Sequence, residues 1–222
     1  MRRARQLALP LPTHGGRRPG AGRKPKGSKA LVSHARRPRF EKTTPVHVTL
    51  RMREHVWNLR RRRCFGLIRG CFEKSVGRFG SRLIEFSVQG NHLHLIVEAD
   101  DNGALSRAMQ GLCIRIAKAL NSLMKRPGAV FSDHYHSRLL RTPTELVRAI
   151  AYVLGNAAHH FGLKEPDPFS SAAVRDDRDL VLARPVSWLM RVGWKRAAPA
   201  DAPVPIGYRT RKSLSPGGNS GV

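Results

Sequence analysis

Two short runs in which apolar and polar residues alternate lie within residues 82–98, and the tripeptide Gln-Gly-Asn at 89–91 joins them. Alternation with a period of two predicts strands, with Ile84, Phe86 and Val88 on one face of the first, and such a short Gly-containing connection predicts a hairpin. The second run opens with His92 and His94, which fall on one face because successive strand side chains point to opposite sides. The chain is therefore expected to build an antiparallel hairpin with two histidines side by side.

Paired imidazoles on one strand face are able to bind a single divalent metal ion. A third ligand has to come from another element, because Glu98 lies about 13 Å beyond His94 along a straight strand. A polar strand surface without a metal is the more common use of two such histidines. The pair thus predicts a metal site only in combination with a second site elsewhere in the chain.

The charge balance restricts the partner of the protein. The 222 residues include 41 Lys and Arg against 15 Asp and Glu, a formal net charge of +26. This excess favours a polyanion, and nucleic acid more than an anionic membrane, since phosphates neutralise the repulsion. No hydrophobic stretch approaches the roughly 18 residues of a membrane span, and the N-terminal residues do not read as a signal peptide. Three cysteines without CxxC spacing favour a reducing compartment.

Residues 1–42 are expected to form a disordered basic arm, because they hold 13 Lys and Arg and a single acidic residue. Its segment GGRRPGAGRKPKGS resembles an AT-hook, in which arginines enter an A·T minor groove. The candidate DNA contacts in it are Arg17, Arg18, Arg23 and Lys24. A nonspecific phosphate-binding arm is the alternative interpretation.

Periodicity places further elements along the chain. A strand is expected at 45–53 and a helix at 59–79, where apolar residues recur at steps of three and four. Four arginines open this helix although positive charge there opposes the helix dipole, which indicates either phosphate contacts or a solvated basic face. These candidate DNA-binding residues are Arg60, Arg61, Arg62 and Arg63. A second helix is expected at 103–125, followed by an extended segment with His-Tyr-His at 134–136.

The third predicted helix carries the second site. Thr142 as N-cap, a proline at the first helical position and Glu145 form a capping-box signature. Tyr152 and Asn156 are four residues apart, so they share one face of this helix at about 5–6 Å. A tyrosine beside a carboxamide can supply a nucleophile and a neutral oxygen ligand, although a half-exposed polar face is the simpler interpretation. Residues 164–222 read as a partly disordered extension with one apolar island, VSWLMRVGW.

The order of these elements, with SVQGNHLHLIVEADD in the hairpin and AYVLGNAAHH in the third helix, resembles the single-tyrosine HUH-endonuclease transposases. The resemblance covers about 45–163 and is strongest for the branch of REP-associated tyrosine transposases. It implies an α+β domain at 43–163, with a ferredoxin-like antiparallel sheet flanked by helices. By their motif positions, His92 and His94 match the ligands of Mg²⁺ or Mn²⁺, Tyr152 matches the nucleophile, and Asn156 matches the residue that completes the metal shell.

The resemblance further implies an enzyme that nicks and rejoins hairpin-associated single-stranded DNA through a 5′-phosphotyrosine, in the nucleoid-containing cytoplasm of a bacterium. A monomer and a homodimer are both compatible with the sequence. Two alternatives lack catalysis: a domesticated transposase kept as a DNA-binding regulator, and a ferredoxin-like RNA-binding module. The first is disfavoured by the intact set of four site residues, and the second by the lack of a row of exposed strand aromatics for base stacking.

Overall fold

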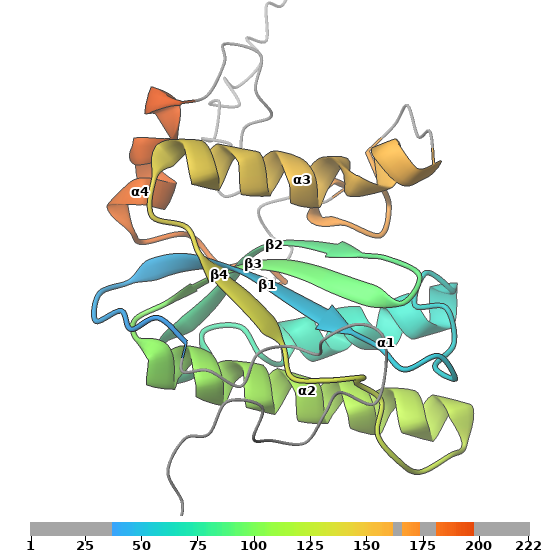
Figure 1. Ribbon diagram of the computed structural model, residues 1–222. Coiled ribbons are helices and arrows are strands. Elements are labelled where there is room, and N and C mark those ends of the chain that lie inside the picture. Colours follow the sequence, from blue (N-terminus) through green and yellow to red (C-terminus); the bar gives the residue numbers. More distant parts are fainter. Residues whose placement is uncertain (1–36, 162–165, 174–180, 198–222) are drawn as a thin grey trace, which may run out of the picture. The chain divides into compact units, whose positions relative to one another are not determined.

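The computed structural model describes residues 37–161, 166–173 and 181–197, and only the backbone of 157–161. Its centre is a four-stranded antiparallel sheet in the order β2-β3-β1-β4, with helices on both faces (Figure 1). The strands are β1 (Thr44–Arg51), β2 (Ser81–Val88), β3 (His92–Ala99) and β4 (His136–Leu139), and the long helices are α1 (Arg62–Glu73), α2 (Asn102–Met124) and α3 (Pro143–Phe161). The predicted α+β fold with a ferredoxin-like sheet is confirmed. Most of the predicted basic arm, residues 1–36, lies outside the described residues, as do 198–222 of the extension.

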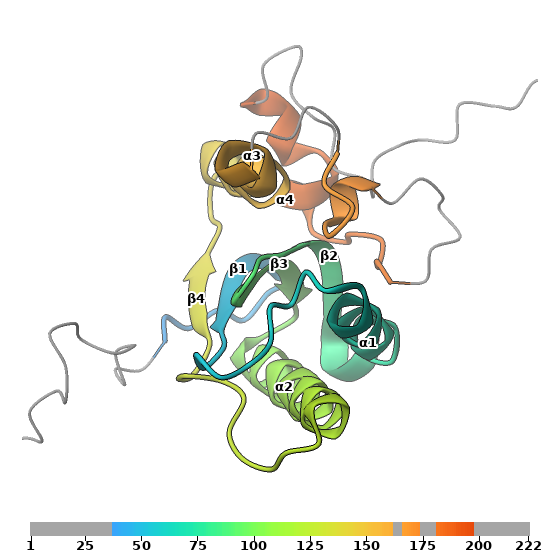
Figure 2. The same ribbon diagram turned by 90° about the vertical axis from the view of Figure 1, so that its right-hand side faces the viewer.

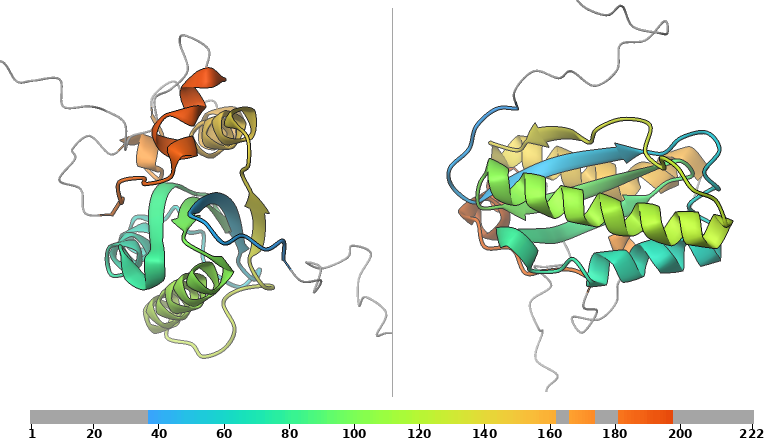
Figure 3. Two further views of the ribbon diagram at one scale, coloured as in Figure 1. Left: turned by 90° about the vertical axis from the view of Figure 1, so that its left-hand side faces the viewer. Right: turned by 90° about the horizontal axis from the view of Figure 1, so that it is seen from below.

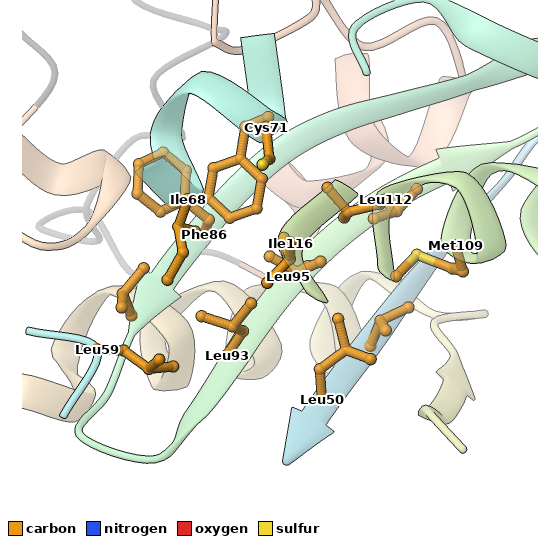
Figure 4. Close-up of a cluster of buried hydrophobic side chains, with 14 of the residues drawn as sticks. Leu50, Leu59, Ile68, Cys71, Phe86, Leu93, Leu95, Met109, Leu112 and Ile116 are labelled. Atoms are coloured by element: carbon orange, nitrogen blue, oxygen red, sulfur yellow. The ribbon is translucent and has the colours of Figure 1, made fainter. Parts of the chain in front are cut away.

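Helices α1 and α2 cover one face of the sheet, and the contact between them and the strands is apolar (Figures 2 and 4). The buried side chains that meet there include Leu50, Phe86, Leu93 and Leu95 from the strands, Ile68 and Cys71 from α1, and Met109, Leu112 and Ile116 from α2. Because strand side chains alternate, burying these residues sends their neighbours to the opposite face. That opposite face receives the histidines.

The register of the strands gathers polar residues on this second face. Thr49 of β1 pairs with His94 of β3 and with His136 of β4, and Arg51 pairs with His92. The predicted hairpin between β2 and β3 is present, with the Gln89 N–H donating to the His92 carbonyl at 2.9 Å. Polar side chains that are well separated in the sequence therefore lie side by side on three adjacent strands.

Helix α3 covers part of the same face, at the opposite side of the sheet from α1 and α2 (Figures 1 and 3). Its apolar residues Leu146, Ile150 and Val153 are buried against Ile84 and Ile96 of the sheet. The predicted N-cap is confirmed, since the Glu145 N–H donates to Thr142 Oγ1 at 3.2 Å. The amphipathic stripe of α3 thus fixes the helix over the sheet and determines where its polar residues lie.

The described part of the C-terminal extension packs on the domain through a buried carboxylate. Glu98, at the end of β3, is fully buried and accepts hydrogen bonds from the N–H groups of Val186 (2.7 Å) and Ser187 (3.0 Å) and from Ser187 Oγ (2.5 Å). Ser187 in turn caps the short helix α4 (Trp188–Arg191). Removal of Glu98 from water is compensated by these three donors. The carboxylate therefore holds the start of α4 against the sheet.

Two local expectations differ from the structure. Helix α1 covers Arg62–Glu73 instead of 59–79: turns follow over 74–77, and Gly77, with a φ of 67°, redirects the chain so that Phe79 is 44% exposed. In β2, a register shift between Leu83 and Glu85 places Ile84 against α3, while Phe86 faces α1 and α2. The simple alternation of β2 predicted both residues on one face, and the extra residue of a bulge reverses that assignment for Ile84.

None of the helices within the described residues is both long and apolar enough to cross a bilayer.

We expect the attachment of α3 to depend on its buried stripe. The substitution Ile150→Ala removes a side chain that is 2% exposed and should lower the free energy of unfolding by about 2–5 kcal/mol. Ile114→Ala on α2, where the side chain is 48% exposed, is the matched control and should change it by less than about 0.5 kcal/mol. Chemical denaturation measures both values, and equal effects of the two substitutions would contradict this packing.

Candidate functional site

His92 and His94 lie next to each other on β3, as the sequence predicts. Their rings meet edge to face with centroids 4.7 Å apart and an interplanar angle of 88°. His94 is buried beneath α3 at 4% exposure, and His92 at the start of the strand is partly exposed. The pair is therefore open to solvent at His92 and shielded by α3 at His94.

In both imidazoles, Nδ1 lies within hydrogen-bond distance of another protein group. Nδ1 of His92 lies 2.8 Å from Asn91 Oδ1, and Nδ1 of His94 lies 3.2 Å from His47 Nε2 and 3.3 Å from Thr49 Oγ1. A carboxamide oxygen only accepts, so Nδ1 of His92 carries the proton and Nε2 carries the lone pair. Hydrogen bonds of this kind fix the orientation and tautomer of histidines that bind a metal through the other nitrogen.

His47 is a residue of the site that sequence reasoning missed. It lies on β1, and its ring centroid is 5.3 Å from that of His94. Burial, followed by the positive charges of His136 and Arg138, lowers the pKa of His47 to about 4. A neutral His47 can accept the proton of His94 Nδ1 and leave Nε2 of His94 with its lone pair. The alternating pattern of β1 puts His47 on the polar face of that strand. Its contact with His94 depends on the pairing of β1 with β3, which the pattern of β1 alone does not reveal.

Tyr152 of α3 lies directly over these histidines. Its ring is edge to face with His94 at a centroid distance of 5.1 Å, and with His47 at 5.9 Å. The side chain is 50% exposed, so its hydroxyl-bearing ring is open to a ligand while one side packs on imidazoles. The structure therefore brings the predicted tyrosine to His94, the buried member of the predicted histidine pair.

Asn156 lies one turn beyond Tyr152 on α3. The helix starts where β4 ends beside the first residues of β1, and it runs back along the sheet toward the end where β3 begins (Figure 1). Asn156 is therefore displaced from Tyr152 toward the His92 end of the site. Its side chain is 3% exposed, and within the described residues its Nδ2 has no hydrogen-bond partner. An unpaired buried N–H donor of this kind can capture an anionic oxygen, such as that of a phosphate.

His92 and His94 alone do not complete a metal site. Within the described ranges, no three His, Cys, Asp or Glu side chains are arranged to hold an ion. A metal at this site would have to use the two imidazoles, the Asn156 carboxamide oxygen and ligands from outside the protein. Such a mixed nitrogen and oxygen set, with open positions, fits a divalent ion of catalytic type.

Tyr135, the other tyrosine close to histidines in the sequence, faces away from the site. It packs against the core between the sheet and helices α1 and α2, and the Arg37 guanidinium lies 3.9 Å from its ring centroid. Burial raises the pKa of Tyr135 above its usual value. The adjacent His136 contributes instead to the lowered pKa of His47. Tyr208 lies outside the described residues.

The four arginines at 60–63, at and just before the start of α1, have different environments. Arg60 forms a bidentate ion pair with Asp167 at 2.8 Å and donates to the Val88 carbonyl at 3.1 Å, so it holds the segment 166–171 against β2. Arg61, Arg62 and Arg63 are exposed. The predicted DNA contacts of Arg17, Arg18, Arg23 and Lys24 lie outside the described residues.

Comparisons with known proteins support one family. The family described as "Transposase IS200 like" matches residues 42–153, half of the chain. A comparison with curated proteins found no match. Among solved structures, the chain is similar to a REP-associated tyrosine transposase bound to a REP hairpin, with a TM-score of 0.52 and 17% identity, over 63% of this chain and 82% of the other. At this identity the likeness concerns the fold.

We expect alanine substitution of Arg60 to lower the stability of the fold, and alanine substitution of Arg62 to weaken DNA binding instead. Arg60→Ala leaves the carboxylate of Asp167, whose side chain is 1% exposed, without its ion pair and should cost about 3–5 kcal/mol of folding free energy. Arg62→Ala should leave stability within about 0.5 kcal/mol but reduce the slope of DNA affinity against salt by about 1. Thermal unfolding and salt-dependent fluorescence anisotropy measure the two effects; loss of stability in the Arg62 variant alone would refute this division.

Proposed function

Because the chain belongs to the IS200-like transposase family, we propose that it nicks and rejoins single-stranded DNA through a covalent 5′-phosphotyrosine on Tyr152. One observation carries the proposal: the Tyr152 ring packs at 5.1 Å on His94, the buried member of the histidine pair. A nucleophile held beside a candidate metal ligand is an arrangement suited to metal-assisted phosphodiester transfer.

The protein groups have separate roles in this reaction. Tyr152 Oη attacks phosphorus, and the new Oη–P bond forms while the bond from phosphorus to the 3′ oxygen breaks. The phenolic proton passes to solvent, and the departing 3′ oxygen takes up a proton to become a hydroxyl. Because the phosphotyrosine keeps the energy of the ester, attack by another 3′-hydroxyl reverses these steps and joins strands without ATP. Helix α3 supplies the orientation by holding the tyrosine over the sheet.

His92, His94 and Asn156 would hold a divalent ion, Mg²⁺ or Mn²⁺, at the His92 end of the site. When bound, the ion polarises the phosphate and offsets the charge that develops on its oxygens. Two imidazoles and one amide oxygen suit Mn²⁺ at least as well as Mg²⁺, which prefers oxygen ligands. His47 and Thr49 would keep the His94 ring in place through its Nδ1.

The DNA partner follows from charge and from the family. The net charge of +26 and the exposed Arg61, Arg62 and Arg63 provide phosphate contacts along a single strand. The structurally similar transposase was solved with a REP hairpin, which supports a hairpin-associated substrate and the REP-associated branch for this chain. We assign strand transfer to the domain at 43–163 and added phosphate binding to the basic arm at 1–42. The retained alternative is a domesticated, non-catalytic DNA-binding regulator.

The test of the nucleophile compares two phenylalanine substitutions. Tyr152→Phe keeps the ring and its packing but removes the attacking oxygen, so the adduct and the nick should both disappear while DNA affinity persists. Tyr135→Phe is the matched control and should retain the adduct, because that ring lies on the other face of the sheet. Full-length protein is incubated with Mg²⁺ or Mn²⁺ and hairpin-containing single-stranded DNA from the flanks of its own gene. The amount of covalent adduct is then measured on a denaturing gel. An adduct in the Tyr152 variant refutes the assignment.

The test of the metal site uses histidine variants. His92→Ala and His94→Ala should each weaken Mn²⁺ binding, measured by titration calorimetry, and abolish metal-dependent cleavage. DNA affinity should change little, because phosphate contacts dominate binding. His134→Ala, at an exposed histidine outside the site, is the control and should behave as the unchanged protein. Full cleavage and Mn²⁺ binding by the His92→Ala/His94→Ala double variant would be incompatible with the assignment.

A further inference from the structure

A cavity of about 590 Å³ opens at the edge of the domain where β1 begins, away from the histidines. Its wall is formed by three separate parts of the chain: residues 39–45, the end of β4 with Arg141, and the start of α4 with Trp188. Sites that bind small organic groups are concave and mostly apolar, with a few polar groups, and their volumes span roughly 300–1,000 Å³. The cavity has the size of such a site.

The chemistry of the wall suits a group that is both aromatic and anionic. Phe40, Leu140 and Trp188 provide apolar surface, and the exposed side chains of Arg39, Lys42 and Arg141 add positive charge. Glu41 is the one acidic residue among those that line the cavity. A nucleotide combines a flat base with an anionic phosphate and matches this combination better than a neutral or acidic peptide would.

Trp188 is exposed but held in place. Its side chain is 52% exposed, yet a Cβ at Gly193 would lie only 2.6 Å from the ring, so the ring lies directly on the Gly193 backbone. The guanidinium carbon of Arg196 is 5.0 Å from the ring centroid. The buried Glu98 carboxylate fixes the two residues before Trp188. Protein groups therefore determine the orientation of a large aromatic surface that is left in contact with solvent.

The opposite wall is fixed as well. The Phe40 N–H donates to Asn102 Oδ1 at 2.8 Å, and Asn102 Nδ2 donates to the Pro38 carbonyl at 3.0 Å. Thr43 Oγ1 donates to Asp100 Oδ1 at 2.8 Å. These hydrogen bonds attach the segment before β1 to the start of α2, so the basic side chains stand on an ordered backbone.

We propose that this cavity binds an unpaired nucleotide of the single-stranded DNA, with its base against Trp188 and its phosphate toward Arg39, Lys42 and Arg141. The inference rests on the proposed function and adds a base-recognition site to it. Thr44 at the cavity and Thr49 opposite His94 are five positions apart on β1, about 17 Å. The bound nucleotide thus lies several nucleotides from the scissile phosphate on the same strand.

The experiment tests whether the loss of one base and the loss of the Trp188 side chain affect DNA affinity through the same contact. A hairpin oligonucleotide from the flanks of the gene carries an abasic site at one unpaired position after another, and affinity is measured by anisotropy for the full-length protein and Trp188→Ala. One abasic position should weaken binding to the unchanged protein by about 5- to 150-fold, and it should have little effect in the variant. Trp188→Phe should keep part of the effect. Ile114→Ala, at an exposed apolar residue of α2, is the control and should keep all of it.

The outcomes separate this inference from the proposed function. Identical abasic profiles for the unchanged protein and Trp188→Ala overturn the cavity assignment, even when the Tyr152 adduct forms. A position whose effect depends on Trp188, in a protein that forms no adduct, supports the cavity and refutes strand transfer. If the chain's own residues 1–36 occupy the cavity, their deletion should change the tryptophan fluorescence without DNA in the protein that has Trp188 but not in Trp188→Phe, and the abasic profiles should be identical; that result also overturns the proposal.

Discussion

The pairing of β1 with β3 is the interaction on which the candidate site depends. Its register sets Thr49 opposite His94 and buries the alternate residues Leu50 and Leu93 beneath α1 and α2. A shift by one residue would turn both histidines into the apolar core, at a prohibitive cost for polar groups. The large core on one face therefore stabilises the fold and also selects which side chains point toward α3 on the other.

Helix α3 depends on the same sheet for the position of its tyrosine. The apolar stripe that includes Ile150 lies on Ile96, two residues beyond His94 on β3, so the packing that holds the helix also sets Tyr152 above the imidazoles. Asn156 follows one turn later because of helix geometry alone. The C-terminal segment contributes from the other end, where Glu98 fixes α4. The buried stripe of α3 thus positions Tyr152 and Asn156 over one end of this sheet face, and the buried Glu98 positions α4 at the other end.

The sequence predicted the features that depend on local pattern. The hairpin, the cap at Thr142 and the shared face of Tyr152 and Asn156 follow from periods and spacings. Features that depend on pairing between distant segments were missed. The contact of His47 with His94 spans 47 positions, and the ion pair of Arg60 with Asp167 spans 107. The bulge at Leu83 and the turn at Gly77 override the periodicity locally, so the apolar pattern predicted too long an α1 and the wrong face for Ile84.

The most direct test of the account is to identify the residue that becomes attached to DNA. Trypsin cleavage after Lys and Arg places Tyr152 in the peptide 149–164 and Tyr135 in a different one, so nuclease digestion of the adduct followed by mass spectrometry can distinguish them. We expect a nucleotide attached through its 5′-phosphate to Tyr152. A nucleotide on Tyr135 or Tyr208 would contradict it.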